Sequence, residues 1–168
     1  TGTYWMKHVT SLDISSKPLD NFWMRKAYRV PKGMFPVARP FATQDDDQTS
    51  PITEIVVNSL ITGPDDGAKV AAAGFTVQGI AWDGGSGIRT VELSSDGGAT
   101  WHPATLGQNL GRFAFRPWSL RIAIGKPGPV KVMARATSNA GAVQQSKLLF
   151  NPAGYNHNVI ETLSLTAA

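Results

Sequence analysis

Turn sequences recur at short intervals after Ile52 and divide the chain into short apolar runs. The turns are clusters of glycine, proline, aspartate and asparagine, namely G-P-D-D-G, D-G-G-S-G, S-D-G-G-A, G-K-P-G-P and S-N-A-G. The runs between them are rich in β-branched and apolar residues, and V-K-V-M-A-R-A alternates with a period of two. This pattern predicts strands over residues 55–61, 75–82, 89–94, 113–124 and 130–137.

About seven strands over about 110 residues is the usual size of an immunoglobulin-like domain. We therefore predict an all-β fold, an immunoglobulin-like antiparallel β-sandwich. The chain has no cysteine, which excludes the disulfide of antibody domains, thiol catalysis and cysteine-ligated metals within it. No apolar run of about 18 residues occurs, so no membrane span is expected.

The first 50 residues differ from the sandwich. Residues 4–14 have strand-like composition and predict an extended segment. Asp20 or Asn21 is expected to N-cap a short helical turn over residues 22–28, which Pro31 would stop. Residues 31–51 hold four prolines and three consecutive aspartates, and this composition indicates an extended surface connection. The aspartates lack the glycine spacing and later glutamate of a calcium loop, so we interpret them as solvated.

The octapeptide S-S-D-G-G-A-T-W, residues 94–101, fits the Asp-box pattern S-x-D-x-G-x-T-W. It predicts a hairpin in which Asp96 accepts backbone hydrogen bonds, Gly97 and Gly98 take positive φ, and Trp101 packs over the turn. A propeller would repeat the motif in each blade, but here it occurs once. We interpret it as a structural feature of the sandwich.

Aromatic and cationic residues crowd together in D-N-F-W-M-R-K-A-Y-R-V-P-K-G, residues 20–33. One interpretation is a solvated amphipathic turn whose aromatics lie in a domain interface. The other is an anion pocket, because arginine offers a planar fork, tryptophan a rigid wall and tyrosine a hydrogen-bond donor. The net charge of +4 favours an anionic partner, yet no dense Lys/Arg stripe indicates nucleic acid. The three histidines are far apart and predict no metal site.

An ordered series of motifs resembles the sulfite oxidase family of molybdenum enzymes. Y-W-M-K-H-V followed by F-W-M-R-K-A-Y-R is similar to the end of that family's catalytic domain, where a W-x-R-[RK]-x-Y block occurs. Residues 79–85 fit G-x-A-W-[SD]-G-G of its C-terminal immunoglobulin-like dimerisation domain. I-R-T-V-E-L-S-S-D-G-G-A-T-W, F-A-F-R-P-W and A-R-A-T-S-N-A-G complete the series, which spans nearly the whole chain.

The resemblance implies oxidation of sulfite to sulfate at a molybdenum–molybdopterin centre. Residues 1–50 would then end the molybdopterin-binding domain and form a linker, and residues 51–168 would be the dimerisation-type domain. The metal-ligating cysteine and most of the pterin site would lie in sequence outside this chain. By position in the motifs, Tyr28 is implied as the catalytic tyrosine, and Arg25 and Trp23 as substrate-binding residues. Trp5, Met6 and Lys7 match the cofactor-binding strand end.

One position departs from the family. Animal members carry an arginine in W-N-L-R-G, whereas this chain has F-N-P-A-G, with Ala153 at that place. Either His157 or an arginine outside the chain would then supply the substrate-binding charge, or anion binding would be weaker. The N-P-A-G-Y form resembles bacterial members, which implies a periplasmic enzyme passing electrons to haem c on a c-type cytochrome partner. The sandwich would pair with itself as a homodimer or with that partner, through exposed aromatics predicted at Phe113, Phe115 and Trp118.

Two alternatives stay open. The first alternative is a non-catalytic immunoglobulin-like module for assembly or carbohydrate contact, because a fold alone does not assign a chemical activity. The second alternative is an enzyme of the same family that acts on a different sulfur compound, such as a sulfane.

Overall fold

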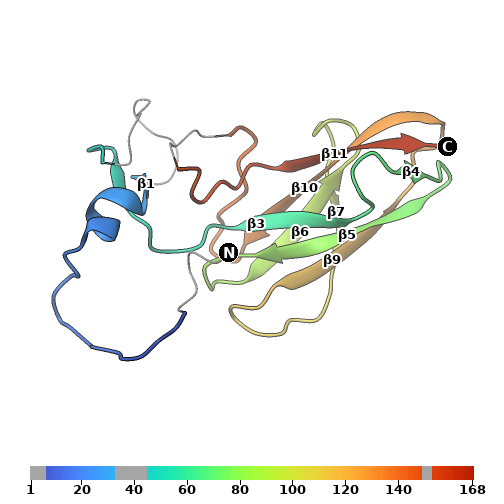
Figure 1. Cartoon of the computed structure of the whole chain (residues 1–168). Helices are drawn as coiled ribbons and strands as arrows, with labels where there is room; N and C mark the ends of the chain where they lie inside the picture. Colours follow the sequence, from blue (N-terminus) through green and yellow to red (C-terminus); the bar gives the residue numbers. More distant parts are fainter. Residues whose placement is uncertain (1–6, 33–44, 149–152) are drawn as a thin grey trace.

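The computed structural model describes residues 7–32, 45–148 and 153–168, and most of its regular structure is β-strand (Figure 1). A short π-helix, η1, precedes the strands. The elements are η1 (Trp23–Ala27), β1 (Arg29–Pro31), β2 (Thr49–Pro51), β3 (Asn58–Gly63), β4 (Lys69–Val70), β5 (Phe75–Trp82), β6 (Ile88–Ser94), β7 (His102–Pro103), β8 (Thr105–Leu106), β9 (Arg116–Ile122), β10 (Gly128–Ser138) and β11 (Glu161–Ala167). No helix in these ranges is long and apolar enough to cross a bilayer.

Two sheets form the predicted sandwich. One has the order β4-β11-β10-β6-β7 and the other β3-β5-β9-β8, and only the β4–β11 pair is parallel. Burial on β10 alternates with a period of two, since Val132, Ala134 and Ala136 are fully buried. They belong to one hydrophobic cluster with Val77 and Ala81 of the opposite sheet. This arrangement confirms the immunoglobulin-like sandwich.

The predicted strands match the observed ones closely in the middle of the chain. β5 has the predicted bounds, and β6 and β10 differ by one or two residues. The strand expected over 113–124 is shorter at both ends, because β9 runs only from Arg116 to Ile122. The sequence interpretation missed β11 altogether, although Leu163 and Leu165 alternate there with polar residues.

Trp118 is 2% exposed, so the expectation that it is a surface aromatic is wrong. It lies opposite Gly79 in the β5–β9 register. A Cβ built on Gly79 would overlap both the Trp118 indole and the Leu60 carbonyl. The indole thus fills the space left by a missing side chain, and this packing places it in the core. Phe113 and Phe115 are exposed, as predicted.

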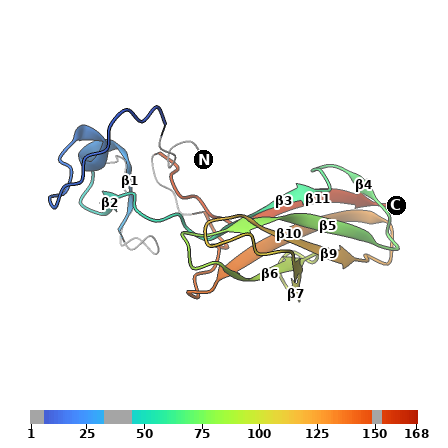
Figure 2. The same ribbon diagram turned by 90° about the horizontal axis from the view of Figure 1, so that it is seen from below.

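The N-terminal part lies to one side of the sandwich (Figures 1 and 2). Its strands β1 and β2 pair antiparallel, with Val30 opposite Ser50. The extended connection expected over residues 31–51 thus begins and ends in paired strands, and residues 33–44 lie outside the described part. Arg29 helps to hold the ribbon, because its Nε donates to Thr49 Oγ1 at 2.8 Å and its Nη1 to the Met24 carbonyl at 3.2 Å. Residues 7–14, expected to be extended, form no regular strand.

The Asp-box hairpin is confirmed as a structural feature. Asp96 accepts hydrogen bonds from Thr100 N at 2.9 Å and Ser94 Oγ at 2.7 Å, and Gly97 and Gly98 have positive φ. Trp101 Nε1 donates to the Gly98 carbonyl at 2.9 Å, and the Arg135 guanidinium stacks over the indole at 4.1 Å. The hydrogen bonds from Thr100 and Ser94 hold the pKa of Asp96 well below its usual value.

Candidate functional site

Tyr28, the predicted catalytic residue, lies in a cluster of aromatic rings. It stacks on Trp23 with ring centroids 5.2 Å apart and planes 20° from parallel. Phe22 packs edge-on against the Trp23 ring, with centroids 5.3 Å apart. Tyr28 also packs edge to face against Tyr155 of the loop before β11, with ring centroids 5.8 Å apart and an interplanar angle of 71°. The cluster therefore joins the two ends of the chain.

The π-helical turn η1 creates the Trp23–Tyr28 stack. The Tyr28 N–H donates to the Trp23 carbonyl at 2.6 Å, a hydrogen bond spanning five residues, which places these two residues one above the other. Asn21 begins the turn, since its Oδ1 accepts from Met24 N at 3.0 Å. Asn21 was one of the two predicted caps. The turn ends at Ala27, before the predicted stop at Pro31, which lies in β1 instead.

The predicted cationic site residues lie at the surface. Arg25 forms an ion pair with Asp20 at 3.1 Å, and its side chain is 68% exposed. Lys7 is exposed in a stretch without regular structure. Among the described contacts none links Arg25 to Tyr28, so its substrate-binding role stays a prediction. Trp5 and Met6, the other predicted cofactor contacts, lie outside the described residues.

His157 lies in the same C-terminal loop as Tyr155. Its Nε2 is buried without a hydrogen-bond partner, and its carbonyl accepts from Asn58 Nδ2 at 3.3 Å. Gly154, with φ of 68°, turns the chain so closely over the imidazole that a Cβ there would come within 3.4 Å of His157 Cε1. The structure therefore places His157 beneath the turn that follows Ala153.

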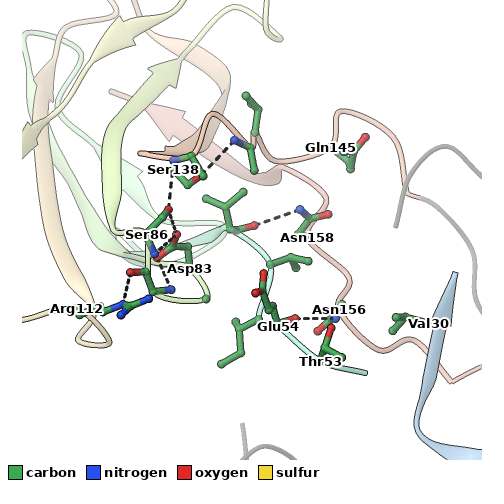
Figure 3. Close-up of a pocket in the computed structure, with 18 residues that line it drawn as sticks. Val30, Thr53, Glu54, Asp83, Ser86, Arg112, Ser138, Gln145, Asn156 and Asn158 are labelled. Atoms are coloured by element: carbon green, nitrogen blue, oxygen red, sulfur yellow. Dashed lines mark hydrogen bonds between the residues drawn. The ribbon is translucent and has the colours of Figure 1, made fainter. Parts of the chain in front are cut away.

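A hollow of about 540 Å³ separates the N-terminal ribbon from the end of the sandwich (Figure 3). Its wall includes Val30 of β1, Glu54 of the following segment and Asn158 of the C-terminal loop. Asn158 is 4% exposed; its Nδ2 donates to the Val57 carbonyl at 3.2 Å, whereas its Oδ1 has no partner. Sequence reasoning missed this hollow, because six separate segments line it and no single motif brings them together.

The turn after β5 forms another wall of this hollow. Asp83 accepts hydrogen bonds from Gly85 N at 3.1 Å, Ser86 N at 3.0 Å and Gly87 N at 2.8 Å, and one from Ser86 Oγ. Burial by itself would raise the pKa of Asp83, but these hydrogen bonds outweigh it and lower the pKa below its usual value. The Asp83 carboxylate thus accepts these hydrogen bonds from residues of its own turn.

The donor set does not fit a molybdenum centre held by this chain alone. The sequence has no cysteine to supply a thiolate, and the described ranges contain no group of three or more His, Asp or Glu side chains suited to a metal ion.

Two curated relatives of this chain are sulfite oxidases. Human mitochondrial sulfite oxidase is 34% identical over 131 residues, covering 73% of this chain and 23% of the relative. The Drosophila melanogaster mitochondrial sulfite oxidase is 31% identical over 155 residues, covering 84% of this chain and 26% of the relative. The chain therefore spans about a quarter of the length of these relatives.

A solved structure shares the fold. The sulfane dehydrogenase SoxCD from Paracoccus pantotrophus superposes with a TM-score of 0.54 at 23% identity, covering 66% of this chain and 30% of that one. Residues 49–165 match the family model of the Mo-co oxidoreductase dimerisation domain. The matched range covers the whole sandwich except its last residues. The chain therefore belongs to the Mo-co oxidoreductase dimerisation domain family and has distant similarity to sulfite oxidases.

Proposed function

We propose that this chain is the C-terminal portion of a molybdenum-dependent enzyme that oxidises sulfite to sulfate. Its family membership and its identity of 31–34% to two mitochondrial sulfite oxidases support this proposal. The rest of the enzyme would supply the molybdopterin and the metal-ligating thiolate.

The contact between Tyr28 and Tyr155 carries the proposal. Tyr28 ends the block that resembles W-x-R-[RK]-x-Y, and Tyr155 follows the N-P-A-G stretch that stands where animal members have W-N-L-R-G. These two motifs lie far apart in the sequence, yet the two rings are 5.8 Å apart. A shared substrate pocket requires such proximity.

Tyr28 would act on the substrate through its phenol. A tyrosine hydroxyl in a pocket with little water donates a hydrogen bond to negative charge that develops on an oxygen. The stack on Trp23 and the edge contact with Tyr155 hold the ring in place. Because Ala153 replaces the arginine of animal members, we assign the missing polar contact of the substrate to His157, whose Nε2 is unpaired.

The proposed enzyme would be periplasmic, would pass electrons to haem c on a c-type cytochrome, and would form a homodimer through the sandwich. The N-P-A-G-Y form of the C-terminal loop supports the bacterial setting. The matching dimerisation-domain family supports self-association.

The test uses the intact natural protein. We expect one molybdenum per chain and sulfite-dependent reduction of cytochrome c. Tyr28→Phe should lower turnover at least about tenfold with unchanged molybdenum content, because it removes only a hydroxyl. Thr105→Val removes an exposed hydroxyl on β8 and serves as the control.

Three results would count against parts of the proposal. A natural protein without molybdenum would indicate the non-catalytic assembly module instead. A molybdenum protein that oxidises a sulfane and ignores sulfite would correct the substrate. An unchanged rate in Tyr28→Phe would remove Tyr28 from the mechanism.

A further inference from the structure

A second, smaller hollow of about 300 Å³ opens at the end of the sandwich, next to the first. The two share Asp83, Gly85, Ser86 and Arg112. The turn between β5 and β6 and the loop between β8 and β9 form most of its lining, and Asn139 closes it where β10 ends. All of its lining residues belong to the described part of the chain.

Arg116 faces into this hollow from the first position of β9. Residues two apart on a strand share a face, so Arg116 lies on the same face as Trp118, which is buried in the core. The Arg116 Nε is buried and has no hydrogen-bond partner. Among the described residues no carboxylate lies within ion-pair distance of it.

Arg112 brings a second guanidinium to the same hollow. Its Nε donates to the Gly85 carbonyl at 2.8 Å, a bond drawn in Figure 3, and its Cζ lies 5.2 Å from the centre of the Phe113 ring. These contacts fix the stem of the side chain and leave its terminal nitrogens available. It too has no carboxylate partner in the described ranges.

The acidic residue of the lining forms no ion pair with these cations, and its single charge offsets only one of the two. The Asp83 oxygens accept their hydrogen bonds from the Gly85–Gly87 turn. Two guanidinium groups therefore face one carboxylate that is already satisfied. A buried cationic nitrogen without an acceptor is costly, which favours an anion at this place.

We propose that this hollow binds a small oxyanion between Arg112 and Arg116. Guanidinium forks bind carboxylate, sulfate and phosphate oxygens through paired N–H donors. The hollow is large enough for such a group together with water. The anion comes either from solution or from an Asp or Glu side chain of a second copy of this chain. This site is separate from the Tyr28 cluster and does not depend on the proposed reaction.

Thermal unfolding of the 168-residue chain tests the site. At constant ionic strength, exchanging chloride for about 10 mM sulfate should raise the Tm of the wild type. Arg116→Met should abolish this rise, and Arg112→Gln should weaken sulfate binding roughly tenfold or more. Arg121→Met, which removes an exposed arginine at the other end of β9, should keep the full rise.

The same series separates an anion site from a structural arginine. Without sulfate, Arg116→Met should be at least as stable as the wild type, because the guanidinium it removes has no partner and methionine keeps the apolar stem. If Arg116→Met is much less stable in chloride buffer or fails to fold, Arg116→Lys decides between the two roles, because it keeps the charge without the fork. Arg116→Lys should lose most of the sulfate response, and a response equal to that of the wild type would overturn the proposal.

Sedimentation velocity in sulfate-free buffer distinguishes the two sources. If a second copy supplies the carboxylate, the wild type should self-associate, Arg116→Met should be monomeric, and sulfate should dissociate the wild-type complex. If the anion comes from solution, sulfate should bind without changing the mass. The proposal fails if sulfate shifts the Tm of all four proteins equally and Arg116→Met associates like the wild type.

Discussion

Tyr28 and Tyr155 pack edge to face with ring centroids 5.8 Å apart, and this contact joins the N-terminal turn to the loop before β11. Neither residue belongs to the core of the sandwich, so their contact helps to fix how the N-terminal part sits on it. Aromatic pairs of this geometry contribute about 0.5–1.5 kcal/mol beyond the area they bury.

Removing the Tyr155 ring should loosen the N-terminal turn. We expect Tyr155→Ala to speed proteolytic cleavage within residues 20–32 several-fold, because the free energy that holds Tyr28 falls by about 1 kcal/mol. Tyr155→Phe keeps the ring and should cleave close to the wild-type rate. Limited proteolysis followed by mass spectrometry measures both. Equal cleavage rates for Tyr155→Ala and wild type would show that the contact does not stabilise the N-terminal turn.

Gly79→Ala should destabilise the sandwich by about 2–3 kcal/mol, because an added methyl group overlaps the Trp118 indole and the Leu60 carbonyl. Urea unfolding followed by Trp fluorescence measures the loss. Gly63→Ala on β3 is the control, since a Cβ there meets Gln78 only at an ordinary 3.5 Å. A Gly79→Ala protein of unchanged stability would mean that β5 and β9 move apart at little cost.

Gln144→Leu should cost about 2–4 kcal/mol, because it leaves buried donors without an acceptor. Gln144 is 4% exposed, and its Oε1 accepts from Ser59 Oγ at 2.6 Å and Ala136 N at 2.7 Å. The neighbouring Gln145→Leu, at a half-exposed position, should change the free energy of unfolding by less than about 0.5 kcal/mol. Similar losses in both variants would contradict this account.

The Asp96 carboxylate should make the free energy of unfolding depend on pH, with lower stability in acid. Its folded pKa is held below the usual value of 3.8 by the hydrogen bonds from Thr100 and Ser94. The stabilisation is therefore fully present above the unfolded pKa and is lost as the pH falls through the folded pKa. Asp96→Asn should be less stable than wild type near about pH 7, with a difference that shrinks below about pH 4.

Urea unfolding at several pH values measures this difference. Asp13→Asn, at an exposed position outside any regular element, is the matched control. A difference between wild type and Asp96→Asn that stays constant down to about pH 2 would show that the charge of Asp96 contributes nothing to the hairpin.

The sandwich could be predicted because its signals are local. Turn residues bounded β5 at both ends, and the Asp box specified its own hairpin through Asp96 and its close neighbours. β11 carried a comparable period of two at Leu163 and Leu165, and the sequence interpretation overlooked it. The buried position of Trp118 was not local information, since it depends on Gly79 of another strand.

The candidate site was predictable only in part, for the same reason. The sequence block around Tyr28 singled out that residue, but nothing near it in the sequence pointed to Tyr155. Arg25 was grouped with Tyr28 by proximity in the sequence, whereas the structure pairs it with Asp20 at the surface. The inward position of Arg116 likewise follows from its register on β9 and from the loops of neighbouring strands.

The β1–β2 ribbon closes a loop, because the Lys32 N–H donates to the Gln48 carbonyl at 2.7 Å beside the paired strands. The hydrogen bond joins backbone atoms alone. It therefore tolerates any side chain at position 48 and any residue except proline at position 32, which would remove the donor N–H.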